Sequence, residues 1–185
     1  LLIIAILVRV KLGSPVVFKQ ERPGRIDPKT GKEKIFTLYK FRTMTDKRGA
    51  DGQLFPDAER MTPFGSALRT SSGDELLELI NIAKSDMSIV GPRPLLLEYL
   101  PRYSEEQRHR HDVRPGLTSL SASKKRNLAS WDEKFEDDVK YANKITFLGD
   151  VKIIIDTIRI VFKREGIHSE TSSTMEYFQG NGDKV

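Results

Sequence analysis

Two adjacent acids, Asp74 and Glu75, are the strongest candidates for chemistry in this 185-residue sequence. Ser72, three residues before Glu75, completes a capping-box pattern, so we expect the pair at the start of a helix. Free backbone N–H groups and the helix dipole stabilise negative charge at that position. The local pattern therefore fits both simple helix capping and a reactive pair of carboxylates.

Three arginines favour the reactive interpretation. Arg69 lies just upstream of the acids, Arg93 lies within Gly91-Pro-Arg-Pro94, and Arg126 lies in another polar segment. Most arginines are solvated, but one held between prolines loses less conformational entropy when it binds a phosphate. The prolines also exclude regular helix, so this segment is predicted to be a rigid loop.

Other sequence patterns exclude several kinds of site. Gly31-Lys32 is not part of a P-loop, because Gly24 lies too far upstream and Glu33 stands where a magnesium-binding hydroxyl is needed. His109 and His111 are alternate residues, which point in different directions on a helix. We expect these histidines to be solvated or structural rather than metal ligands.

The composition fits one domain with an anionic partner. The chain is 38% hydrophobic, which suffices for one modest core, and it has a net charge of +5 and no cysteine. The lack of cysteine excludes disulfides and thiolate metal sites. No nucleic-acid-binding motif is recognised, and no aromatic residues are interleaved with a dense basic patch, so nucleic acid is not an expected partner.

The N-terminal half is predicted to contain a small antiparallel sheet. Val16–Phe18 and Ile35–Met44 are rich in β-branched and aromatic residues and are expected to pair as strands. Between them, residues 22–32 contain proline and glycine and are expected to form a loop. Residues 46–60 are polar and are expected to form an exposed excursion.

The remaining predicted elements are helices. One helix is expected over 74–84, and two further capping boxes, Ser104 with Gln107 and Ser130 with Glu133, start helices that run toward His111 and Tyr141. The predicted fold class is therefore α+β: a mostly helical small domain with a short β-hairpin or small sheet.

Two apolar segments raise the question of a membrane. Phe147–Lys163 is an amphipathic helix, which usually packs on a core, but its wide apolar face and basic residues also suit a membrane interface. The run Leu1–Val8 is shorter than the roughly 18 residues that a spanning helix needs. By itself it is as compatible with a buried strand or a core helix as with part of a longer apolar segment.

Several of these segments, in this order, resemble the bacterial sugar transferase family, the monotopic phosphoglycosyl transferases. The resemblance covers most of the chain and is closest to the small members that act in protein glycosylation. Because several motifs match in order, the resemblance is more specific than any single motif. The matching segments are Gln20-x-Arg-Pro-Gly24, Tyr39-Lys-Phe-Arg-Thr-Met44, Arg69 to Glu75, Asp86-Met-Ser-Ile-Val-Gly-Pro-Arg-Pro94, Glu98-Tyr-Leu-Pro101, His109-Arg-His-Asp-Val-Arg-Pro-Gly116 and Arg126-Asn127.

The resemblance implies a magnesium-dependent transfer of a sugar phosphate from a UDP-sugar to polyprenol phosphate, such as undecaprenyl phosphate. Asp74 would be the nucleophile, and Glu75 would help to bind Mg²⁺ or organise the acceptor. Because an anion attacks an anion, cations must neutralise the phosphate charge. The implied phosphate-binding residues are Lys40, Arg69, Arg93 and Arg126, and the implied metal ligands are Asp74 and Glu75.

The resemblance also implies a location, the cytoplasmic face of the bacterial inner membrane. There Leu1–Val8 would be the returning half of a re-entrant helix, and residues 1–185 would be one catalytic domain lacking the first half of that helix. The sequence leaves open which sugar is used and whether the chain forms a homo-oligomer.

Two departures from the family pattern favour an alternative. Gly73 stands where the family usually has an apolar residue, and Ser119–Asn127 differs from the family's usual substrate-side stretch. A non-catalytic homologue that binds a lipid or a partner at the membrane surface is therefore the main rival hypothesis. The retained acids and Arg93 favour the enzyme.

Overall fold

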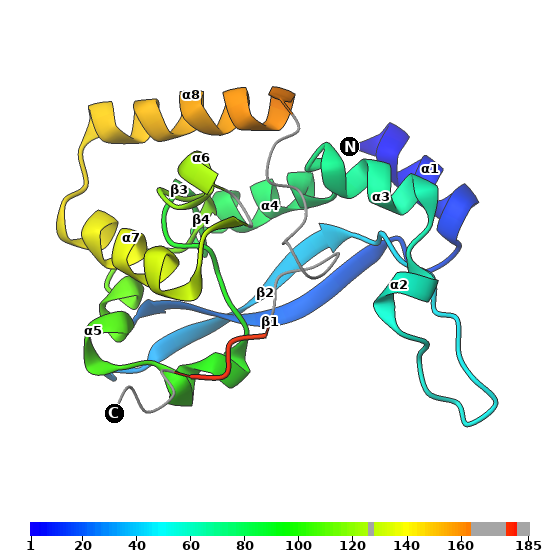
Figure 1. Ribbon diagram of the computed structural model, residues 1–185, viewed down its shortest axis with the longest axis horizontal. Coiled ribbons are helices and arrows are strands. Elements are labelled where there is room, and N and C mark those ends of the chain that lie inside the picture. Colours follow the sequence, from blue (N-terminus) through cyan, green and yellow to red (C-terminus); the bar gives the residue numbers. More distant parts are fainter. Residues whose placement is uncertain (126–127, 164–176, 181–185) are drawn as a thin grey trace.

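A long β-hairpin runs through the middle of the molecule, and helices surround it, in the computed structural model (Figure 1). The structure describes residues 1–125, 128–163 and 177–180. The predicted α+β class is confirmed. In chain order the elements are α1 (Leu2–Leu12), β1 (Val17–Ile26), β2 (Glu33–Phe41), α2 (Asp57–Arg60), α3 (Pro63–Thr70), η1 (Gly73–Leu77), α4 (Glu78–Ala83), β3 (Ser88–Val90), η2 (Leu97–Arg102), α5 (Glu105–Arg108), η3 (His109–His111), β4 (Gly116–Thr118), α6 (Ala122–Lys125), α7 (Trp131–Asn143) and α8 (Phe147–Lys163).

The hairpin pairs β1 with β2 in antiparallel register, so the predicted pairing is confirmed. The predicted loop over residues 22–32 is wrong in its first part, because β1 continues to Ile26. Pro23 faces Ile35 just before a register shift, a place where the missing proline N–H costs no ladder bond. Gly24 follows, and a Cβ there would lie 2.8 Å from the Lys34 carbonyl oxygen. The strand can continue only because this residue has no side chain.

The acidic segment does not begin as the sequence predicts. The expected helix over 74–84 is a 3₁₀ turn, η1, followed by the short helix α4. Ser72 adopts a left-handed conformation with φ of 56°, and its side chain makes no capping bond. The Ser72–Glu75 capping box is therefore wrong, because the Glu75 carboxylate is engaged elsewhere.

The other two capping boxes are confirmed. Ser104 caps α5 and Ser130 caps α7, and in each box the residue three positions later returns a bond to the backbone of the serine. The residues 46–60 form the excursion that projects at the lower right of Figure 1.

Asn81 joins α4 to the outer edge of the hairpin. Its side chain is fully buried, its Nδ2 donates to the Thr37 carbonyl at 2.7 Å, and its Oδ1 accepts from the Tyr39 N–H at 3.2 Å. These are backbone groups of β2, so one amide side chain replaces part of a neighbouring strand. The contact fixes the acidic segment against β2.

A second, smaller sheet holds the Gly91–Pro94 loop. β3 and β4 are parallel, with Ser88 opposite Gly116 and Val90 opposite Thr118. The loop leaves β3 directly, without helix, as predicted. The Gly116 N–H donates to the Pro92 carbonyl at 3.0 Å, which fastens the start of the loop to β4.

The described C-terminal segment, residues 177–180, lies beside η2 (red in Figure 1). Phe178 is 3% exposed and packs among the rings of Tyr99, Tyr103, Trp131 and Phe135. Its backbone N–H donates to the Tyr99 hydroxyl at 3.2 Å. An aromatic cluster thus joins this segment to η2 and α7.

Two helices carry exposed apolar residues on the upper side of Figure 1, α1 and α8. In α1, Ile3 and Val10 are more than 70% exposed, and in α8, Phe147 and Phe162 are more than 80% exposed. Leu1–Val8 is therefore part of a helix that lies largely outside the core, although Val8 itself is buried. Among the described helices, none has both the length and the apolarity to cross a bilayer.

We expect Asn81→Ala to lower the free energy of unfolding by about 2 to 4 kcal/mol, because it leaves two backbone groups of β2 without partners. The matched control is Asn143→Ala, at an exposed position at the end of α7, where the loss should stay below about 1 kcal/mol. Urea unfolding of both variants checks this. Equal losses would show that Asn81 does not hold the edge of the hairpin.

Candidate active site

Lys40 on β2 brings two acids of the η1–α4 segment together. Its Nζ donates to Glu75 Oε1 at 2.8 Å and lies 3.1 Å from Glu78 Oε1. All three side chains are less than one-fifth exposed. One cation from the hairpin therefore compensates two largely buried carboxylates, and it fixes the acidic segment relative to β2.

Arg93, from the Gly91–Pro94 loop, approaches the same carboxylate from another side. Its Nη2 donates to Glu75 Oε1 at 2.5 Å, while about half of its side chain remains exposed. Burial alone would raise the pKa of Glu75, but the charges of Arg93 and Lys40 outweigh it and hold the pKa well below its usual range. Glu75 is therefore a permanent anion that organises two cations.

Asp74 is in a different situation. Its side chain is buried, yet its carboxylate accepts no hydrogen bond from the residues that the structure describes. Burial, reinforced by the charge of Glu75, raises the pKa of Asp74 to about 6, against the opposing charges of Lys40, Arg69 and Arg93. This carboxylate does not cap a helix. It is a carboxylate without a hydrogen-bond donor among the described residues, and cations surround it.

Of the four predicted phosphate-binding residues, the structure brings three to the acids. Lys40 and Arg93 contact Glu75 directly, and the charge of Arg69 acts on Asp74. Arg69 Nε donates to the Thr43 hydroxyl at 3.0 Å, which anchors the side chain near the end of β2. Arg126 lies outside the described residues.

Glu78 belongs to the site, but sequence reasoning missed it. Its side chain is 2% exposed, and burial together with the Glu75 charge raises its pKa to about 7. The available signal was spacing, because Glu78 follows Glu75 by three residues and so lies on the same side of a helical segment. An acid in an otherwise apolar run was the clue.

Of the two adjacent acids, Asp74 fits a magnesium ion that is shared with a substrate. Among the described residues, no three Asp, Glu or His side chains are grouped so that they could hold a metal alone. Mg²⁺ commonly uses one or two protein carboxylates and completes its shell with phosphate oxygens and water. Asp74, whose carboxylate accepts no hydrogen bond within the described part of the chain, is a suitable ligand of this kind, whereas Glu75 is already bound to Lys40 and Arg93.

The two histidines make contacts within the fold. His109 pairs with Asp112 at 2.8 Å on the surface, and buried His111 contacts the Gly24 carbonyl, so the predicted structural or solvated roles are confirmed.

The stretch Ser119–Asn127, which departs from the family pattern, contacts α7 in its described part. Lys124 pairs with Asp137 of α7, and Lys125 pairs with Glu133 of α7.

The arrangement is suited to nucleophilic attack on a phosphate. A carboxylate with a pKa near 6 is ionised at neutral pH, yet it is more basic than an ordinary aspartate. Lys40, Arg69 and Arg93 supply fixed positive charge around it, which a phosphate ester needs while negative charge is redistributed. The charge of Glu75 keeps Lys40 and Arg93 in place.

Comparisons with known proteins show similarity to sugar transferases. The family described as Bacterial sugar transferase matches residues 1–164. The uncharacterized sugar transferase EpsL of Bacillus subtilis is 50% identical over 96% of this chain and 85% of its own length. The undecaprenyl-phosphate galactose phosphotransferase of Salmonella typhimurium is 30% identical over 84% of this chain. The UDP-glucose:undecaprenyl-phosphate glucose-1-phosphate transferase of Xanthomonas campestris is 35% identical over 84% of this chain. The chain spans about a third of each of the last two proteins, 35% and 34% of their lengths.

We expect the Asp74 carboxyl to titrate near pH 6, well above an ordinary aspartate. Lys40→Met and Arg69→Gln should each move this midpoint upward, because each removes a charge that favours the ionised form. Carboxyl ¹³C NMR of labelled aspartates measures it, with Asp74→Asn identifying the signal.

The control for these charge removals is Lys34→Met, which removes an exposed lysine paired with Asp86. It should leave the Asp74 midpoint unchanged. A wild-type midpoint near 4 would contradict the electrostatic description of the site.

Proposed function

The chain belongs to the bacterial sugar transferase family, and from this we propose that it transfers a sugar 1-phosphate from a UDP-sugar to a polyprenol phosphate such as undecaprenyl phosphate. The observation that carries the proposal is Asp74, a buried carboxylate that accepts no hydrogen bond from the described residues and is surrounded by Lys40, Arg69 and Arg93. The named reactions of the Salmonella and Xanthomonas relatives support the same class of donor and acceptor. The products are a polyprenyl-diphosphate sugar and UMP.

In the first step, an oxygen of the Asp74 carboxylate forms a bond to the β-phosphorus of the UDP-sugar. The bond from that phosphorus to the bridging oxygen breaks, and UMP leaves with the bond's electron pair. The sugar phosphate remains on Asp74 as an acyl phosphate. In the second step, a phosphate oxygen of the acceptor attacks the same phosphorus, and the Asp74 carboxylate is released.

The other residues of the site act on charge. Arg93 and Lys40 are held by Glu75, so they are oriented before substrate binds, and they can stabilise diphosphate oxygens without reorganising. Arg69 is anchored on Thr43 and adds charge next to Asp74. Asp74 would hold Mg²⁺ when it is bound, and the metal would supply further positive charge against the diphosphate.

Membrane attachment through α1 and α8 is the second part of the proposal. The acceptor is a lipid, so the site must work at a bilayer surface, on the cytoplasmic side where UDP-sugars are made. α1 is 11 residues long, about 16 Å, which is too short to cross the roughly 30 Å hydrocarbon core. Exposed Phe147 and Phe162 of α8, together with its lysines and arginine, suit the interface of an anionic membrane.

The central experiment is release of UMP from a panel of UDP-sugars, with and without polyprenol phosphate. We expect Asp74→Asn to reduce turnover by several orders of magnitude, roughly 10³-fold or more, because an amide is a poor nucleophile and a weaker metal ligand. Excess chelator should abolish turnover and Mg²⁺ should restore it. The control is Asp112→Asn, an exposed aspartate that pairs with His109, which should retain wild-type turnover.

The covalent step is tested by mass spectrometry of the wild-type protein after incubation with UDP-sugar alone. A sugar-phosphate adduct should map to the peptide that contains Asp74 and should disappear when acceptor is added. An active enzyme that shows no adduct, together with an active Asp74→Asn variant, would refute the covalent mechanism. Absence of turnover with every UDP-sugar would favour the non-catalytic homologue.

We expect the chain to sediment with anionic liposomes and the Phe147→Ser/Phe162→Ser double variant to bind at least about tenfold more weakly, because two exposed aromatic side chains no longer enter the interface. The matched control is Ile35→Ser/Leu54→Ser, two exposed apolar residues on the hairpin and the excursion. Equal binding of both double variants would exclude α8 as the membrane contact.

A further inference from the structure

The loop that carries Arg93 is fixed by hydrogen bonds as well as by the rigidity of its two prolines. Before the arginine, the Gly91 N–H donates to the Thr118 carbonyl, and the Gly116 N–H donates to the Pro92 carbonyl, each at 3.0 Å. Both bonds come from the β3–β4 sheet. They fix the start of the loop, but they do not involve the carbonyls of Arg93 and Pro94.

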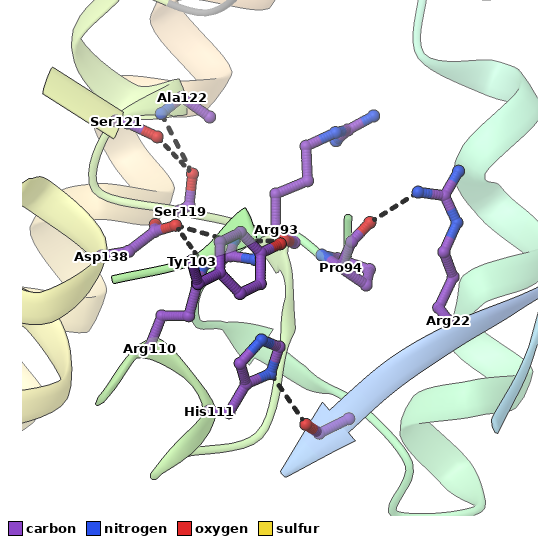
Figure 2. A network of polar contacts seen from close by, with 11 residues as sticks. Arg22, Arg93, Pro94, Tyr103, Arg110, His111, Ser119, Ser121, Ala122 and Asp138 are labelled. Atoms are coloured by element: carbon purple, nitrogen blue, oxygen red, sulfur yellow. Dashed lines mark hydrogen bonds and ion pairs between the residues drawn. The ribbon is translucent and has the colours of Figure 1, made fainter. Parts of the chain in front are cut away.

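Two further arginines hold the carbonyls of Arg93 and Pro94 from opposite sides (Figure 2). Arg110 Nη2 donates to the Arg93 carbonyl at 2.7 Å, and Arg22 Nη1 donates to the Pro94 carbonyl at 3.2 Å. A charged donor makes a stronger bond to a carbonyl than a neutral one does. Two consecutive carbonyls are thus fixed by guanidinium groups that come from η3 and β1.

Arg110 is itself rigidly placed. It is 2% exposed, its Nε and Nη2 donate to Asp138 Oδ2 at 3.1 and 2.7 Å, and its Nη1 donates to the Tyr103 hydroxyl at 3.2 Å. Asp138 is also buried, and the Arg110 charge opposes the rise in the pKa of Asp138 that burial causes. The planar fork of Arg110 is therefore oriented by Asp138 of α7 and by Tyr103, which directly follows η2.

A buried ion pair is weak evidence of a contribution to stability, since desolvation of both charges offsets their attraction. A pair that served only the core would also need no bond to the loop. The donation from Arg110 to the Arg93 carbonyl links this pair, in one step, to a residue whose side chain contacts Glu75 at 2.5 Å.

We propose that Arg110 is a positioning residue for the active site: oriented by Asp138, it fixes the Arg93 peptide so that the Arg93 guanidinium lies against Glu75, with Arg22 holding the next carbonyl. The inference rests on the proposed function for its turnover measurements. Its spectroscopic test does not, so failure of one is distinguishable from failure of the other.

The first test observes Arg93 directly through the ¹⁵N signals of its guanidinium, identified by their loss in Arg93→Gln. Arg110→Lys keeps a cation next to Asp138 but loses the planar fork. We expect the Arg93 signals to move to the position of a solvated arginine in Arg110→Lys. The matched control is Val139→Ala, which removes buried apolar volume next to Asp138. It removes none of the hydrogen bonds that link Asp138, Arg110 and Arg93, so its Arg93 signals should stay at the wild-type position.

The second test uses a double-mutant cycle on kcat/KM. We expect Arg110→Lys to lower kcat/KM by on the order of 10- to 100-fold, as a displacement of a substrate-binding group does. Because Arg110 acts through Arg93, adding Arg110→Lys to Arg93→Gln should cause almost no further loss.

Three outcomes would overturn the proposal: unchanged Arg93 signals in Arg110→Lys, the same signal change in Val139→Ala, or fully additive losses in the cycle. If no UDP-sugar is turned over, the ¹⁵N measurement still decides the positioning role, while the assignment as a transferase fails separately.

Discussion

The ion pairs of Lys40 with Glu75 and Glu78 are the interaction on which the site depends. Two acids, both largely buried, would be costly on one short segment without a cation, and the cation is supplied by the hairpin. This requirement determines how η1 and α4 lie on β2. It also explains why Asp74, the buried neighbour of Glu75, accepts no hydrogen bond from any residue in the part of the chain that the structure describes. The cation that would otherwise pair with it is already shared by two other carboxylates.

The sequence predicted those elements that local bonding decides. The capping boxes at Ser104 and Ser130 formed as expected, because each closes within four residues and faces solvent. The Ser72 box failed for the opposite reason. Glu75 could bond to the backbone beside it or to Lys40, 35 residues away, and the buried ion pair prevailed. A capping pattern is a weak predictor where its acid is needed for a tertiary contact.

The site itself was predicted in part. The local pattern singled out Asp74, Glu75, Arg69 and Arg93, the resemblance added Lys40, and the structure places these residues together. What sequence could not reveal was the support behind them, since the buried partners Arg110 and Asp138 are 28 residues apart and look like ordinary surface charges. Glu78 escaped notice for the same reason. Charged residues are rarely buried, so a sequence gives little reason to place them inside.

The aromatic cluster around Phe178 bears on where the folded unit ends. The match to the family model stops at residue 164, which by itself would suggest a boundary, although the similarity to EpsL covers 96% of the chain. The packed unit extends further along the chain, because Phe178 is almost fully buried against Tyr99, Tyr103, Trp131 and Phe135. Removing this one ring would lose about 2 kcal/mol of stabilisation from apolar burial. It would also expose apolar surface on the four aromatic side chains around it. For this chain, the family-model match and cooperative folding therefore mark different limits. A shortened version designed from that match alone would be prone to aggregate.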